Sequence, residues 1–124
     1  MGSAIGKMLA IQKKIKLMKS RIEQLQEFLK EDSNDSFLKY ALALEYVKVK
    51  ENELARDCFL KLIKDDENYV ASYYQLGKLY ELLNEVEKAI EIYKNGIDVA
   101  KNSKDAKTLS ELQEAYNMLL EIDD

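Results

Sequence analysis

The chain has 124 residues, which is enough for one domain, and 47% of them are hydrophobic while 34% are charged. It contains no proline and only four glycines, so the turn residues that hairpins of strands require are scarce and a mostly helical chain is predicted. A net charge of −4 argues against a nucleic-acid-binding protein, and the single cysteine excludes an internal disulfide framework and fits a reducing compartment.

The first 21 residues are basic and contain no acidic residue. Their basic residues are Lys7, Lys13, Lys14, Lys16, Lys19 and Arg21. A secretory signal would place its charges before one apolar block, whereas here lysines and apolar residues alternate. The chain also lacks a run of apolar residues long enough to span a bilayer. We therefore expect a cytoplasmic protein.

Residues 5–31 carry an apolar seam in steps of three and four residues. Its members are Met8, Ile11, Ile15, Met18, Ile22, Leu25 and Leu29. This a/d pattern over about three heptads predicts a coiled-coil-like helix. In a parallel homodimer Lys14 would lie near Lys19 of the second copy, which is repulsive. The seam therefore favours an acidic partner helix, an antiparallel copy, or the acidic remainder of this chain.

Three interpretations of this helix stay open. Residues 1–31 hold seven basic and three acidic residues, a net charge of +4, which leaves −8 for residues 32–124. The helix extends the array and covers its first hydrophobic layer, or it oligomerises through the seam, or it lies on anionic lipid. Membrane binding is the least favoured of the three. Because Met18 would make an ordinary start, residues 1–17 are either native or a fused helix.

Two segments of the chain repeat each other without a gap at an offset of 34 residues, Ser36–Tyr69 and Val70–Ser103. Leu42-Ala43 falls on Leu76-Gly77, Tyr46 on Tyr80, Ala55 on Ala89, Phe59 on Tyr93, and Ile63 on Ile97. Each copy divides into two amphipathic helices, 37–49 with 53–65 and 71–83 with 86–100. Polar breaks at 50–52 and 84–85 separate them, where an Asn can adopt a turn conformation. Such a period predicts a repeat protein.

The spacing and residue types resemble the tetratricopeptide repeat (TPR), whose pattern is large, Leu, small, Tyr, then Ala, aromatic and small. The second copy matches it as Tyr73, Leu76, Gly77, Tyr80, Ala89, Tyr93 and Gly96. The first copy departs at Lys39 and Leu62. As a whole, the chain resembles the short two-repeat TPR proteins of bacteria. The resemblance implies an all-α solenoid of helical hairpins, with two full repeats and flanking helices.

The flanks extend the repeat on both sides. Leu25 and Leu29 fall one period before Phe59 and Ile63, so residues 20–35 are interpreted as a half-repeat. Leu112 and its neighbours reproduce the first-helix pattern two residues late, which predicts a capping helix in residues 104–124. The predicted segments are thus 1–19 as the basic helical extension, 20–35, 36–69, 70–103 and 104–124.

In this family the first helix of each repeat lines a concave groove. The resemblance implies a partner-binding row made of Phe37, Tyr40, Leu44, Val47, Tyr74, Lys78, Glu81 and Leu112. Tyr40 and Tyr74 are expected to be exposed contact residues, because neither occupies a core position of the family. Family members that grip a chaperone's C-terminal carboxylate use a basic clamp on these positions. Only Lys78 is basic here, so we do not expect that ligand.

Nothing in the sequence predicts catalysis, a metal site or a cofactor. The chain has no histidine, the commonest general base and metal ligand. Cys58 lies beside the core aromatic Phe59 and is interpreted as a small buried hydrophobe. No glycine-rich phosphate loop is present, and the acidic clusters lack the spacing of a calcium loop.

The favoured function is therefore a non-catalytic module that binds a peptide or helix of another protein in the TPR groove. The alternative is an assembly protein that self-associates through the heptad seam of the N-terminal helix.

Overall fold

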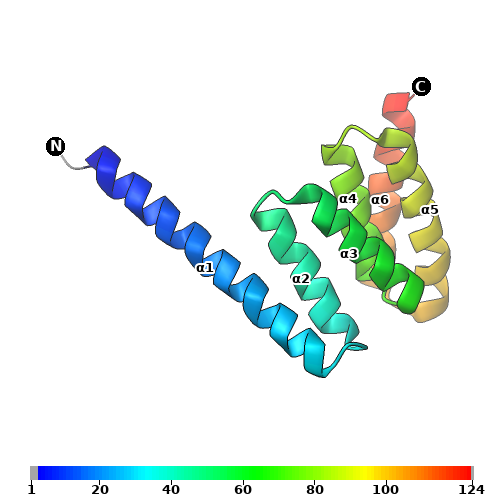
Figure 1. Ribbon diagram of the computed structural model, residues 1–124. Helices are drawn as coiled ribbons and strands as arrows, with labels where there is room; N and C mark the ends of the chain where they lie inside the picture. The colour runs from blue at the N-terminus through cyan, green and yellow to red at the C-terminus, as the bar shows by residue number, and fades with distance from the viewer. Residues whose placement is uncertain (1–2, 124) are drawn as a thin grey trace. The chain divides into compact units, whose positions relative to one another are not determined.

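A computed structural model describes residues 3–123, which contain six helices and no strand (Figure 1). The helices are α1 (Ser3–Glu31), α2 (Ser36–Lys48), α3 (Asn52–Asp65), α4 (Ala71–Leu82), α5 (Val86–Ser103) and α6 (Ala106–Asp123). The prediction of an all-α repeat fold is confirmed, and α1 continues unbroken across residues 19 and 20. The chain divides into two compact units, with the boundary between Ala55 and Arg56 in α3.

The turns after α2 and after α4 end their helices with the same hydrogen-bonding pattern, 34 residues apart in the sequence. Lys50 and Asn84 have positive φ angles of 63° and 60°. After α2, the Glu51 N–H donates to the Tyr46 carbonyl at 2.9 Å, and after α4 the Glu85 N–H donates to the Tyr80 carbonyl at 2.8 Å. This is the Schellman arrangement, which normally uses glycine. The first turn therefore places Lys50, rather than the expected asparagine, in the left-handed conformation.

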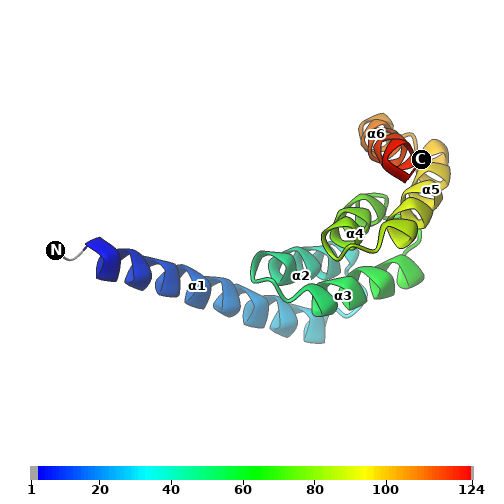
Figure 2. The same cartoon turned by 90° about the horizontal axis from the view of Figure 1, so that it is seen from above.

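In the unit that ends at Ala55, the C-terminal part of α1 packs against α2 (Figures 1 and 2). Ile22 and Leu25 of α1 and Leu42 and Ala43 of α2 are buried. Asp35 caps α2, because its side chain accepts a hydrogen bond from the Leu38 N–H at 3.0 Å. The seam residues of α1 that meet α2 thus form a core in this unit.

A nearly buried carboxylate joins the two helices of this unit. Only 4% of the Glu45 side chain is exposed, and its Oε1 lies 3.1 Å from Arg21 Nε and 3.2 Å from Lys48 Nζ. A carboxylate withdrawn from water is costly unless it is paired. The two cations satisfy that requirement, and Arg21 does so across the interface between α1 and α2.

In the unit that begins at Arg56, α5 packs against both α4 and α6. Figure 2 shows α5 and α6 side by side. A Cβ atom on Gly77 would lie 2.0 Å from the ring of Tyr93, and one on Gly96 would lie 2.6 Å from Tyr73 Cβ. Both distances are far below van der Waals contact. Gly77 is therefore required by the close approach of the Tyr93 ring, and Gly96 by the close approach of Tyr73 on α4. The small residue expected at position 77 has this physical basis.

We expect Gly77→Ala to destabilise the protein by roughly 2 kcal/mol or more, because the methyl group would overlap the buried Tyr93 ring and force the helices apart. Gly77→Leu should destabilise the protein more than Gly77→Ala does, because its side chain is larger. Gly6→Ala is the matched control: Gly6 lies in α1 with open space around it. That change should stabilise by up to about 1 kcal/mol, through helix propensity alone. Thermal unfolding of both variants measures the difference, and equal melting temperatures would contradict the packing described.

A second expectation concerns the pair between Arg21 and Glu45. Arg21→Met keeps the length of the aliphatic stem but leaves the buried carboxylate with Lys48 alone, so a loss of about 1–2 kcal/mol is expected. Urea unfolding of Arg21→Met, Glu45→Gln and the double variant gives the coupling between them. If the decreases in the free energy of unfolding of the two single variants add up to that of the double variant, the two side chains do not interact in solution.

Candidate protein-binding surfaces

The predicted contact residues on α2 follow one face of that helix in steps of three and four residues. Phe37 at the start of the row is 65% exposed. Tyr40, Leu44 and Val47 are half-buried. All four side chains are apolar or aromatic, and each retains surface that a partner could cover. Tyr40 is thus less exposed than the sequence analysis expected.

The predicted contact residues on α4 form a small network rather than independent side chains. Lys78 Nζ lies 5.5 Å above the ring of Tyr74 and 3.8 Å from Glu81 Oε2. The Tyr93 hydroxyl donates a hydrogen bond to the same carboxylate, and the Tyr74 and Tyr93 rings lie 6.4 Å apart at 40°. Burial, reinforced by this hydrogen bond, raises the pKa of Tyr93 far above its usual value. The hydroxyl therefore stays a donor to Glu81.

The α4 surface consequently offers an aromatic ring, a cation and a carboxylate held in fixed positions. Tyr74 is half-buried rather than fully exposed, because its ring leans against the core residue Tyr93. A ring supported in this way loses little conformational freedom when a ligand covers it.

Leu112 was wrongly assigned to this contact row. Its side chain is fully buried, and its Cδ1 lies 3.2 Å from the position of a Cβ on Gly96, in the packing of α6 against α5. Near the start of the same helix, Asp105 caps α6, because its carboxylate accepts hydrogen bonds from the N–H and the hydroxyl of Thr108. These hydrogen bonds hold the pKa of Asp105 below its usual value. The equivalence of Leu112 with the family's core leucine already pointed to burial.

The heptad seam of α1 divides into a covered and an uncovered part. Ile22 and Leu25 are buried within their own unit, so these two residues are not available as an oligomer seam. Met18 is half-buried, whereas Met8, Ile11 and Ile15 are exposed. The change falls near the level where α2 ends, as the contact of Arg21 with Glu45 shows. The C-terminal part of the seam is thus buried against α2, whereas its N-terminal part is exposed to solvent.

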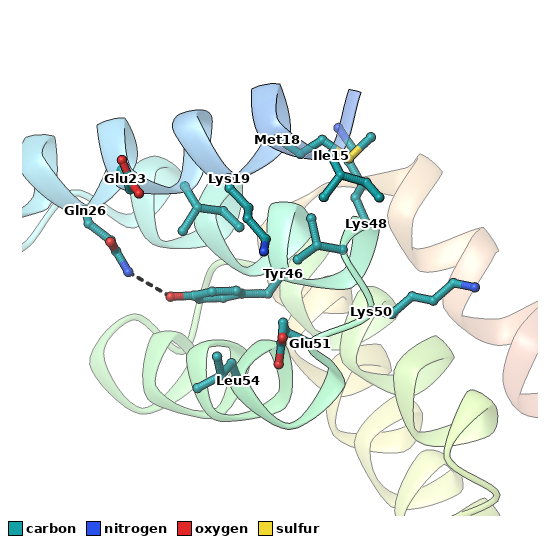
Figure 3. A pocket seen from close by; sticks show the side chains of 12 residues that line it. Ile15, Met18, Lys19, Glu23, Gln26, Tyr46, Lys48, Lys50, Glu51 and Leu54 are labelled. Atoms are coloured by element: carbon teal, nitrogen blue, oxygen red, sulfur yellow. Dashed lines mark hydrogen bonds between the residues drawn. The ribbon is translucent and has the colours of Figure 1, made fainter. Parts of the chain in front are cut away.

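A pocket that the sequence analysis did not anticipate lies between α1 and the C-terminal end of α2 (Figure 3). Its volume is about 700 Å³. The lining residues are Ile15, Met18, Lys19, Ile22, Glu23 and Gln26 from α1, and Tyr46, Lys48, Val49, Lys50, Glu51 and Leu54 from α2, the turn and the start of α3. Three lysines and two glutamates stand around mostly aliphatic walls.

The Tyr46 ring forms part of the pocket wall, and its hydroxyl accepts a hydrogen bond from Gln26 Nε2 at 2.9 Å (Figure 3). Tyr46 is the counterpart of the buried Tyr80 in the repeat, but its own side chain is half-buried. The pocket combines residues from three segments, and only the seam positions Ile15, Met18 and Ile22 had been marked as an interaction surface. The other side of the pocket is lined by Val49, Lys50 and Glu51 of the turn after α2 and by Leu54 of α3.

The described residues include one thiol, that of Cys58. Within residues 3–123, no three potential His, Cys, Asp or Glu ligands gather in a way that could hold a metal ion. Cys58 is half-buried, and burial, followed by the charge of Asp57, raises the pKa of its thiol. A thiol that stays protonated is a poor nucleophile. None of the helices between Ser3 and Asp123 is both long and apolar enough to cross a membrane.

The comparison with protein families finds one match, in which residues 58–91 fit the tetratricopeptide repeat. No curated protein matches the chain. PcrH, solved in complex with the chaperone binding region of PopD, superposes with a TM-score of 0.80 over 100% of this chain and 96% of its own. The sequence identity is 11%, so this likeness shows the fold alone.

Two solved structures share much more of the sequence. The solution structure of a tetratricopeptide repeat domain protein from Salinibacter ruber is 42% identical and covers 72% of this chain and 90% of its own, with a TM-score of 0.69. A crystal structure of a tetratricopeptide repeat domain protein from Salinibacter ruber is 44% identical and covers 68% and 96%, with a TM-score of 0.66. With this identity over nearly the whole of a solved repeat domain, the chain belongs to the tetratricopeptide-repeat family.

Proposed function

We propose that this protein is a non-catalytic interaction module that binds a peptide or helix of another protein. The proposed contacts lie on α2 and α4, the first helices of the two repeats, with which this family lines its concave groove. The observation that carries the proposal is the outer face of α2. It begins with the exposed Phe37 and continues through three half-buried apolar or aromatic side chains. Exposed aromatic side chains that retain apolar area are typical anchors of protein interfaces.

The α4 face supports the same proposal with different chemistry. Tyr74 offers a ring backed by Tyr93, while Lys78 and Glu81 offer one charge of each sign. Of the related folds, PcrH was solved with a segment of another protein bound. Among the proposed contact residues of α2 and α4, only Lys78 is basic. We therefore propose a mainly apolar ligand rather than a chain-terminal carboxylate.

The absence of catalysis is part of the proposal. The chain has no histidine, and the only thiol is held in its protonated form. We place the protein in the cytoplasm because a single cysteine fits a reducing compartment.

The alternative function is assembly through α1. Exposure of Met8, Ile11 and Ile15 favours it. The charges beside them oppose it, because every flanking charge up to Arg21 is positive. Molar mass in solution, measured for the full chain and for a version that starts at Met18, tests this alternative. If both are monomers, self-association is not the function.

The groove proposal is tested with two aromatic residues. Peptides are selected from a phage-displayed library on the full chain, and their affinity is measured for Phe37→Ala with Tyr74→Ala. Truncation of interface aromatics costs about 2 kcal/mol or more, so at least a ~30-fold loss is expected. Melting temperature should fall only slightly, since Phe37 is exposed and Tyr74 keeps part of its surface in solvent.

The matched control is Phe28→Ala with Tyr116→Ala, which removes the same two residue types from α1 and α6. Phe28 is exposed and Tyr116 half-buried. This variant should retain the selected peptides. Peptides that bind both double variants equally well would place the binding surface elsewhere, and a library that yields no specific peptide would refute the groove.

A further inference from the structure

The N-terminal half of α1 displays an apolar row that is largely exposed in its own unit. Ile11 and Ile15 are 57% and 43% exposed, and Met8 precedes them by one helical step. Further along the same helix, the same heptad row is buried against α2 at Ile22 and Leu25. One helix therefore has a covered and an uncovered section of a single packing surface. The uncovered section presents residue types of the same kind and spacing to solvent.

The uncovered row leads into the pocket beside α2. Ile15 and Met18 belong to the row and also line the pocket, together with Val49 and Leu54. Figure 3 shows Leu54 on the side of the pocket opposite α1. A helix lying along the row would thus reach a cavity of about 700 Å³ at one end. An apolar side chain at the end of that helix could enter it and cover further aliphatic surface.

Charge identifies the occupant. Lys7, Lys14 and Arg21 recur at seven-residue spacing on one flank of the row, and the first acidic residue of the chain is Glu23. On the covered section, Arg21 is already paired: α2 places Glu45 against its guanidinium at 3.1 Å. The packing of α2 therefore shows how a helix satisfies this flank, by presenting a carboxylate. Lys7 and Lys14 stand in the equivalent position on the uncovered section.

A second copy of α1 does not meet this requirement. In a parallel pair Lys14 would face Lys19, and in an antiparallel pair each flank would face its own copy, so the lysines of one helix would again face lysines. We propose that this surface, made of Met8, Ile11, Ile15 and Met18 with flanking Lys7, Lys14 and Lys19, binds an acidic amphipathic helix of another protein. The apolar residues of that helix recur at heptad spacing, and one of its ends lies in the α1–α2 pocket.

The test uses two synthetic helical peptides with the same leucines at heptad positions. One carries glutamate and the other lysine at every flanking position. We expect the acidic peptide to bind the full chain at least about tenfold more tightly than the basic one, and to weaken as salt is raised. The variant Lys7→Glu with Lys14→Glu should shift the preference toward the basic peptide.

The apolar row is tested by Ile11→Asn with Ile15→Asn, which should weaken the acidic peptide about tenfold or more, because a polar residue enters the packed seam. Leu9→Asn with Leu17→Asn is the matched control. Leu9 and Leu17 are 60% and 63% exposed on the same helix but stand outside the row. Leucine is a better helix former than isoleucine, so the control pair loses at least as much helix propensity as the first pair. A loss of the peptide by the first pair alone therefore comes from the row itself. Circular dichroism checks that helix content is retained.

The proposal would be overturned by equal affinity for both peptides, by equal effects of the two asparagine pairs, or by a stable homo-oligomer that Ile11→Asn with Ile15→Asn dissociates. Binding to phosphatidylserine vesicles without binding to the acidic peptide would likewise replace it with a lipid surface. Phe37→Ala with Tyr74→Ala should leave affinity for the acidic peptide unchanged. The groove and the α1 surface can therefore fail independently of each other.

Discussion

The ring of Tyr93 occupies the space that a side chain on residue 77 would need, so α4 and α5 pack at ring-to-backbone distance. This approach has consequences on the outer side of α4. The Tyr93 hydroxyl reaches Glu81, and the Tyr93 ring supports that of Tyr74. Two of the candidate contact residues are therefore positioned by the core, because one buried tyrosine contributes to packing with its ring edge and to the surface with its hydroxyl.

The unit that ends at Ala55 depends on a polar rather than an aromatic contact. Glu45 is nearly buried, and it is tolerated because Arg21 and Lys48 lie beside its carboxylate. The seam residues Ile22 and Leu25, which follow Arg21 on α1, are buried in the packing against α2. The rest of the seam remains exposed, with lysines where the covered section has an arginine with an acidic partner. A structural ion pair thus indicates the chemistry of the partner proposed for the neighbouring surface.

The repeat architecture fixes a scaffold but not a ligand. A tetratricopeptide repeat requires small residues and aromatics at set positions. In the second repeat these positions are buried. The outer positions of α2 and α4 and the N-terminal half of α1 are free of that requirement, so they can carry binding chemistry. On α2 that chemistry is apolar and aromatic, on α4 it is mixed, and on α1 it is apolar with a basic flank. The partners proposed for this chain are therefore inferred from these surfaces rather than from the fold.

The sequence by itself determined the helices, the 34-residue period and the need for a small residue at position 77, because periodicity and close approach are encoded in local residue types. It also identified the seam of α1 as one surface. Only the tertiary structure decided that Ile22 and Leu25 are covered while Ile11 and Ile15 are not, that Leu112 is internal, and that Tyr46 lines a pocket. Burial depends on where a neighbouring helix ends and how its turn folds back, and no local pattern records that.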